Sequence, residues 1–231
     1  MRKMISFLLV FFLLAAPACA YADTVITTGG TGEAFVAADN AVISLGVSAR
    51  DRDVLQAQAK VNEAIAAIRT ALIASGIAEQ DINTDYINIY AMVDYREGAE
   101  ELTAYNANST LAIRVTKMDA VGEVIDIAFG AGANTLNGIS FSASDTEEAK
   151  EAALKAAVKD ARAKAEILAE AAGLSITGIE TIQEGSTYSY DRGAGNNFAF
   201  DAAAKQSVAG TVVQAARLTV SASISITFTA E

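Results

Sequence analysis

The chain has 231 residues, of which 17 are Lys or Arg and 28 are Asp or Glu, and its formal net charge at pH 7 is −11. It contains no histidine or tryptophan, and Cys19 is its one cysteine. The acidic balance argues against nucleic acid, whose binding depends on neutralised phosphates, and against anionic lipid surfaces. Without histidine, Ser-His-Asp and Cys-His catalysis is excluded and the commonest zinc ligand is missing.

Residues 1–22 have the pattern of a cleavable signal peptide. Two basic residues precede an apolar run over 5–16, and small residues occupy Ala20 and Ala22 at the exit. The run is too short for a membrane-spanning helix, which needs about 20 residues, so we predict no transmembrane span. We expect cleavage after Ala22, with Ala20 as the alternative. Residues 23–231 then form the exported, periplasmic domain, which contains no cysteine and can form no disulfide.

Residues 24–49 have the alternation of strands. Apolar and small residues alternate over 41–48, as in a strand covered mainly on one side. Three glycines upstream indicate an irregular or bulged first strand: Gly29, Gly30 and Gly32.

An amphipathic helix follows, because apolar residues recur at spacings of three, four and seven between Asp53, a capping residue, and Gly76, a typical stop. Period-two patterns over 82–95 and 105–116 then predict a hairpin, with the polar stretch 96–102 as its loop.

A shorter helix is predicted over 118–131 and a strand over 135–143. The clearest element is a long helix that begins at a cap on Ser144 or Asp145 and ends at Gly173. Its apolar face is mostly alanine, which has the highest helix propensity and allows a neighbouring backbone to approach closely.

The last part predicts a strand over 176–183, a loop over 185–197 rich in Gly, Ser, Asn and Tyr, and a strand signal over 208–229. An unbroken strand of that length would approach about 70 Å, so we expect it to bend or bulge. Its first half is apolar on both faces, for example at Val212 and Val213, and a partner subunit could provide the second cover.

The order of these elements predicts an α+β fold with helices packed on a mainly antiparallel sheet. Two strand-helix-strand passages suggest a weak internal repeat.

No catalytic, cofactor-binding or metal-binding residue is predicted. Asp81, Asn83 and Asp85 have the spacing of the start of a calcium loop, but Tyr86 stands where such a loop has glycine and Met92 where it has its terminal Glu. Alternate positions on a strand explain the same spacing.

Three weaker candidates concern binding or catalysis. The glycines near residue 30 resemble a phosphate cradle, but no Lys-Ser or Lys-Thr follows and no helix begins there. Glu33 and Asp39 could form a carboxylate pair across a turn, the kind of site that an enzyme without histidine would need. The composition of the late loop favours a disordered loop over an exposed contact patch formed by Tyr188, Tyr190, Asp191 and Arg192.

Short motifs spread over nearly all of 23–231 carry a family resemblance. They are Thr31-Gly32-Glu33-Ala34 with Ala38-Asp39, Ile43 to Val47, Gly76-Ile77 with Asp81 to Thr84, Gly132-Ala133-Asn134 with Gly138 to Phe141, and Asp160 to Glu166 followed by Gly173. In this order and spacing they resemble the SIMPL-domain family, with its YggE-like and periplasmic immunogenic members. Ala38 departs from the family pattern, which usually has proline before the aspartate.

The resemblance implies a periplasmic or outer-membrane-associated protein without established catalytic residues. It also implies a link to oxidative stress and, in some members, assembly into large ring-like or channel-like oligomers. We therefore expect a non-enzymatic envelope protein that forms a homo-oligomer and uses no cofactor. The alternatives are a carboxylate-dependent enzyme and a periplasmic protein that binds a small ligand, although the sequence names no ligand.

Overall fold

The computed structural model describes residues 24–96, 99–190, 210–214 and 217–231. Its strands form two antiparallel sheets, one in the order β1-β7-β6 and one in the order β3-β4-β2-β5. The strands are Thr24–Ala37 (β1), Asn40–Asp51 (β2), Ile82–Arg96 (β3), Ala99–Val115 (β4), Thr135–Ser142 (β5), Ile176–Tyr190 (β6) and Arg217–Ala230 (β7). The helices are Val54–Ala74 (α2), Val121–Gly130 (α3) and Glu147–Ala172 (α4), with short 3-10 turns at Glu79–Asp81 (η1) and Met118–Ala120 (η2).

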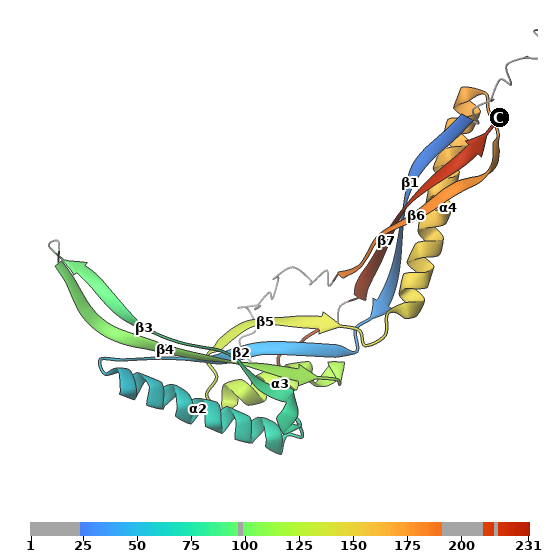
Figure 1. The fold of residues 1–231 in the computed structure, drawn as a ribbon. Helices are drawn as coiled ribbons and strands as arrows, with labels where there is room; N and C mark the ends of the chain where they lie inside the picture. The colour runs from blue at the N-terminus through green and yellow to red at the C-terminus, as the bar shows by residue number, and fades with distance from the viewer. Residues whose placement is uncertain (1–23, 97–98, 191–209, 215–216) are drawn as a thin grey trace, which may run out of the picture.

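The two sheets lie in two parts of an elongated, bent molecule (Figure 1). We call the part formed by β1, β6, β7 and α4 the terminal unit, and the part formed by β2 to β5 with α2 and α3 the central unit. The predicted α+β fold with helices on antiparallel sheet is confirmed. The weak internal repeat stays a prediction. The strands on either side of α2 belong to one sheet, whereas the strands on either side of α4 belong to different sheets.

Small residues bring α4 close to β1 in the terminal unit. A Cβ atom on Gly30 would lie 2.1 Å from the carbonyl oxygen of Ala157, and one on Gly32 would lie 2.1 Å from that of Ala153. Val220, Ile226 and other even-numbered residues of β7 complete this core. The helix buries every fourth residue, always an alanine: Ala149, Ala153, Ala157, Ala161, Ala165 and Ala169.

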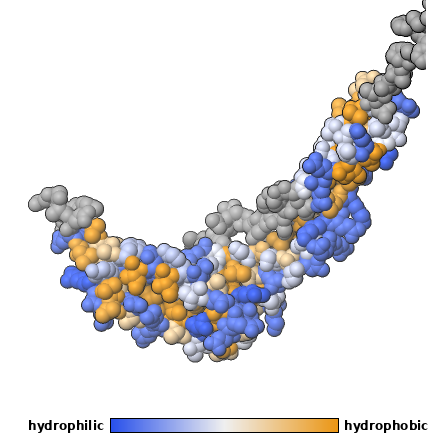
Figure 2. All heavy atoms as spheres, in the orientation of Figure 1, coloured by the Kyte–Doolittle hydropathy of each residue, from blue (hydrophilic) through white to orange (hydrophobic). Residues whose placement is uncertain are grey.

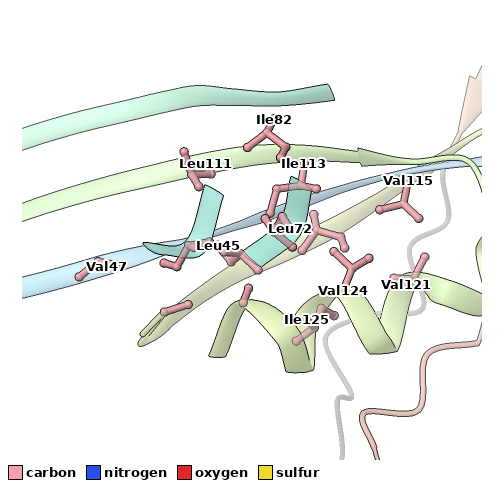
Figure 3. Close-up of a cluster of buried hydrophobic side chains, with 14 of the residues drawn as sticks. Leu45, Val47, Leu72, Ile82, Leu111, Ile113, Val115, Val121, Val124 and Ile125 are labelled. Atoms are coloured by element: carbon pink, nitrogen blue, oxygen red, sulfur yellow. The ribbon is translucent and has the colours of Figure 1, made fainter. Parts of the chain in front are cut away.

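The larger core lies in the central unit, between the second sheet and the helices α2 and α3 (Figure 3). Leu45 of β2 and Ile113 of β4 are fully buried there, and Leu72 of α2 and Ile125 of α3 pack into the same cluster. The periodicity of the sequence predicts a strand that is covered mainly on one face and an amphipathic helix, and both are confirmed here.

The predicted helix ends are confirmed. Asp53 accepts hydrogen bonds from the backbone N–H groups of Leu55 and Gln56 at 2.8 and 3.1 Å, so it caps α2. Gly76 and Gly173 follow α2 and α4 with φ angles of 100° and 74°, in the left-handed region that favours glycine.

Of the two caps predicted for α4, Asp145 is the residue that contacts the helix start. Its carboxylate accepts a hydrogen bond from the backbone N–H of Glu147 at 2.9 Å. Ser144 instead hydrogen-bonds to Asp39, outside the helix.

Residues 24–49 form two strands, β1 and β2, which are separated at Ala38 and Asp39 and belong to different sheets. The bulge predicted for the first strand is wrong. β1 pairs with β7 in unbroken register from Thr24 to Ala37, so its glycines introduce no bulge. Their role is the close approach of α4, because a Cβ at two of them would collide with the helix backbone.

Two other boundaries differ from the predictions. The strands of the hairpin extend to Arg96 and Ala99, so most of the predicted loop 96–102 belongs to the sheet. The last strand begins at Arg217 rather than 208, and residues 210–214 belong to no helix or strand.

Residues 1–22 lie outside the described residues, so the signal peptide and its cleavage site stay predictions. None of the helices in the described part of the chain combines the length and the hydropathy that a membrane crossing requires.

Candidate functional site: the junction between the units and an exposed hairpin

The three residues with the spacing of a calcium loop make separate contacts. Asp81 lies 3.5 Å from the Nε of Arg114, and Asn83 donates to the carbonyl oxygen of Gln80 at 3.1 Å. Asp85 follows on β3. Among the described residues, no group of three or more acidic, His or Cys side chains is placed to hold a metal ion.

Of the two carboxylates considered as a pair, Glu33 lies on β1 opposite Ser221, and Asp39 lies between β1 and β2. Asp39 receives hydrogen bonds from the backbone N–H of Ser144 at 2.9 Å and from the side-chain amide of Asn40 at 2.6 Å. The pKa of Asp39 lies below its usual value, chiefly because the backbone N–H of Ser144 stabilises the charged carboxylate. A general acid needs the opposite shift, so this environment does not support Asp39 in that role.

The predicted loop over 185–197 is partly a strand. β6 continues to Tyr190, and its pairing with β7 includes Tyr188 opposite Ser221 and Tyr190 opposite Thr219. Asp191 and Arg192, with the rest of the predicted patch, lie outside the described residues. The contact patch therefore stays a prediction.

A cavity of about 370 Å³ lies between the end of α2, the end of β4 and the start of α3. Its lining carries both charges, with Asp81 and Glu123 opposed by Arg114 and Lys117, and apolar side chains such as Val124. Among its described lining residues, no nucleophile is paired with a base.

The best-defined polar cluster is at the junction between the two units. The chain passes from β1 to β2 through Ala38 and Asp39, and it returns from β5 to α4 through residues 143–146. These two crossings are tied together: the backbone N–H of Asp39 donates to Ser142 at 3.0 Å, and the carboxylate of Asp39 accepts from Ser144. We call this cluster the Asp39 tie.

A second tie lies on α3, where the chain approaches the start of β7. The carboxylate of Asp126 accepts hydrogen bonds from the backbone N–H of Thr211 at 2.9 Å and from its hydroxyl. Gly122, one turn earlier on α3, leaves the space for this contact, because a Cβ there would lie 1.9 Å from the carbonyl oxygen of Thr211. Val213 packs against the core of the central unit. We call this contact the Asp126 tie.

The free edge of β1 is closed by side chains of α4. Asp160 accepts from the backbone N–H of Thr31 at 2.9 Å, and Lys164 donates to the carbonyl oxygen of Gly29 at 3.2 Å. Asp160 and Lys164 also pair with each other at 2.6 Å. An edge whose backbone groups are occupied in this way is a poor template for another strand.

The hairpin of β3 and β4 differs in the side chains that it exposes. It curves away from α2 toward its tip (Figure 1), and it carries apolar side chains that are about half exposed or more. They are Tyr86 (55%), Ile87 (64%), Tyr90 (48%), Val93 (43%) and Leu102 (49%). Figure 2 shows apolar residues at the surface of both units.

These features define an α+β protein of two antiparallel sheet units, joined by hydrogen-bonded crossings, whose described residues present no recognisable catalytic group. The chain belongs to the SIMPL family, because the family model, described as a protein of unknown function (DUF541), matches residues 26–228.

Three relatives illustrate the similarity. The 26 kDa periplasmic immunogenic protein of Brucella melitensis is 30% identical over 161 residues, which is 67% of this chain and 64% of that protein. The uncharacterized protein YggE of Edwardsiella ictaluri is 25% identical over 161 residues, or 68% of this chain and 66% of its own length. YggE of Escherichia coli is 27% identical over 144 residues, which is 62% of this chain and 58% of that protein. The matched part of this chain therefore spans less than two thirds of each relative.

The motif residues that carry the resemblance lie at structural contacts. Gly32 lies under α4, Asp39 forms a tie, and Asn134 hydrogen-bonds to the edge of β2. The sequence reasoning missed Asp126 and Thr211, because their contact joins segments 85 residues apart and neither residue carries a local signal. A glycine inside a predicted helix, Gly122, was the available hint of a close approach.

Proposed function

We propose that this chain is a non-enzymatic exported protein of the cell envelope that acts by self-association. The names of its relatives support the location, because two Brucella relatives are called periplasmic. The same names include no enzymatic activity. The link to oxidative stress rests on the family resemblance and is part of the proposal.

The exposed hairpin carries the self-association proposal. Tyr86 and Ile87 are neighbours on β3, so their side chains point to opposite faces of the ribbon, and both are more than half exposed. Both lie on the free edge of the sheet, where β4 also pairs with β2. Beyond Asp51 and Tyr105 the hairpin is a two-stranded ribbon, in which Val93 and Leu102 are paired and exposed. Such a ribbon is marginally stable in water unless something covers it. A second copy of the chain can provide that cover.

Val212 and Val213, in the first half of the last predicted strand, give this proposal weaker support than their apolar character suggests. Val213 is covered by the core of its own central unit, so it needs no partner. Val212 is 88% exposed and isolated from that core. The hairpin is therefore the main candidate interface among the described residues; residues 208, 209, 215 and 216 lie outside them.

The test is the solution mass of the purified chain by size-exclusion chromatography with light scattering at micromolar concentration. We expect a discrete species larger than a monomer, and we expect Ile87→Asp to reduce its mass, because a carboxylate in a covered apolar contact is costly. Val212→Asp is the matched control, since it adds the same charge at an exposed residue away from the hairpin. A monomeric parent, or equal effects of the two variants, would count against the proposal.

A further inference from the structure

In the described part of the chain, two crossings join the units, from β1 to β2 and from β5 to α4, and residues 210–214, which precede β7, contact the central unit. The Asp39 tie joins the crossing between β1 and β2 to the crossing between β5 and α4. The Asp126 tie holds the segment that precedes β7 against α3 of the central unit. In each tie, one carboxylate accepts hydrogen bonds from the backbone N–H and the hydroxyl of a residue in a distant segment.

The cores of the two units are separate. The buried cluster of the terminal unit comes from α4 and β7 with partly buried residues of β1 and β6, and that of the central unit comes from β2, β4, α2 and α3. The described residues form no hydrophobic cluster shared by both units, so the contacts between the units in this part of the chain are the short crossings and their hydrogen bonds.

We propose that the Asp39 and Asp126 ties form a two-point latch that holds the terminal and central units at one angle, and that this angle determines how copies of the chain associate. The second clause rests on the proposed self-association, whereas the first does not. Loss of either tie leaves both cores intact and lets the units reorient about the crossings, as in a hinge.

The angle can be measured within one copy by pulsed electron spin resonance. Spin labels are attached at Glu63→Cys in α2 and Lys159→Cys in α4, two exposed helical positions, in a chain whose native cysteine is removed by Cys19→Ser. Labelled chain is diluted with unlabelled chain, so that the distances come from single copies.

We expect Asp39→Ala and Asp126→Ala each to shift and broaden the distance distribution, with the helical circular dichroism unchanged. Asp160→Ala is the matched control, because it removes a carboxylate that also accepts a backbone N–H, from Thr31, but within the terminal unit. An unchanged distribution in both tie variants, or an equal change in the control, would overturn the latch.

A steric variant tests the Asp126 tie without a change of charge. Gly122→Ala would place a Cβ 1.9 Å from the carbonyl oxygen of Thr211, so we expect it to displace that segment and to change the distance as Asp126→Ala does. Alanine favours the helix over glycine, so loss of α3 cannot explain the effect. Gly130→Ala on the same helix is the control, because a Cβ there meets nothing within 4 Å. Equal effects at the two glycines would contradict the tie.

The mass of the assembly tests the second clause. If the tie variants change the distance and also change the mass of the self-associated species, the latch controls association. If they change the distance but leave a multimeric parent's mass unaltered, the control of association is wrong. A monomeric parent overturns the proposed function and this clause, while the distance measurement still decides the latch by itself.

Discussion

The side chain of Asn134 takes the place of a strand residue beside Ser48. Its Oδ1 accepts the backbone N–H of Ser48 at 2.8 Å, and its Nδ2 donates to the carbonyl oxygen of Ser48 at 2.8 Å. The pairing of β2 with β5 ends at Gly46 and Thr135, and the backbone N–H of Asn134 donates to Gly46 at 3.0 Å. Asn134 therefore extends the ladder beyond β5 and satisfies backbone groups of β2 that would otherwise need water.

Asn134→Asp keeps the acceptor but loses the donor and places a negative charge beside the carbonyl oxygen of Ser48. We expect the free energy of unfolding to fall by about 1–3 kcal/mol, as for a lost hydrogen bond that leaves an acceptor unpaired. Urea unfolding followed by circular dichroism measures the change. Asn62→Asp, at an exposed position of α2, should change it by less than about 0.5 kcal/mol. Equal losses in the two variants would show that Asn134 has no special role.

Gly30→Ala and Gly32→Ala test the contact between β1 and α4. Each added methyl group would lie 2.1 Å from a carbonyl oxygen of the helix, so the helix must move away from the sheet. We expect a loss of at least about 1–3 kcal/mol, the usual cost of overpacking, and a lower melting temperature. Gly29→Ala is the control on the same strand, because the nearest atom to its Cβ is 3.8 Å away. If that variant is destabilised as strongly, the close approach is not the cause.

The local elements were predictable because their signals are local. Asp53 and Gly76 mark the ends of α2 through contacts within a few residues, and the alanine stripe of α4 shows its buried face directly. The period-two alternation also identified the strands of both sheets. These signals depend on neighbours in the sequence, and they needed no knowledge of the tertiary structure.

The division into two units was not predictable from the same signals. The sequence pattern over 24–49 does not show that the chain changes sheet at Ala38 and Asp39. Which strand pairs with which depends on contacts between distant segments, such as β1 with β7. The apolar character of Val213 was correctly detected, and it packs against the core of its own chain.

The candidate site was predictable only through the family motifs. Asp39 and Asn134 belong to motifs that carry the resemblance, yet their roles are hydrogen bonds to residues about 100 positions away, Ser144 and Ser48. Asp126 belongs to no motif, and its contact with Thr211 appears only when α3 and the segment before β7 are placed together.

Asp53→Ala should destabilise the central unit by removing the cap of α2. The carboxylate satisfies the N–H groups of Leu55 and Gln56, and such a loss typically costs about 1 kcal/mol. Thr146→Ala is a useful comparison, since Thr146 precedes α4 but its side chain makes no capping hydrogen bond. The urea midpoint should fall further in Asp53→Ala than in Thr146→Ala. A larger loss of stability in Thr146→Ala would contradict the assignment of Asp53 as the cap.

The Asp39 tie should weaken in acid, and the direction follows from its pKa. In the folded chain the pKa of Asp39 lies below the ordinary 3.8, chiefly because the backbone N–H of Ser144 stabilises the carboxylate. A lowered pKa contributes stability above the unfolded value of 3.8, and this contribution is lost as the pH falls through the folded value. The parent should therefore lose more stability than Asp39→Asn when the pH is lowered from about 6 to about 3.

Urea midpoints of the two chains across that range measure the difference. Ser144→Ala provides the matched control, because it removes the hydroxyl but keeps the backbone N–H that dominates the shift, and it should retain most of the parent's acid sensitivity. If Asp39→Asn and the parent lose stability in parallel, the carboxylate is not held by Ser144 in solution, and the Asp39 tie cannot fix the angle between the units.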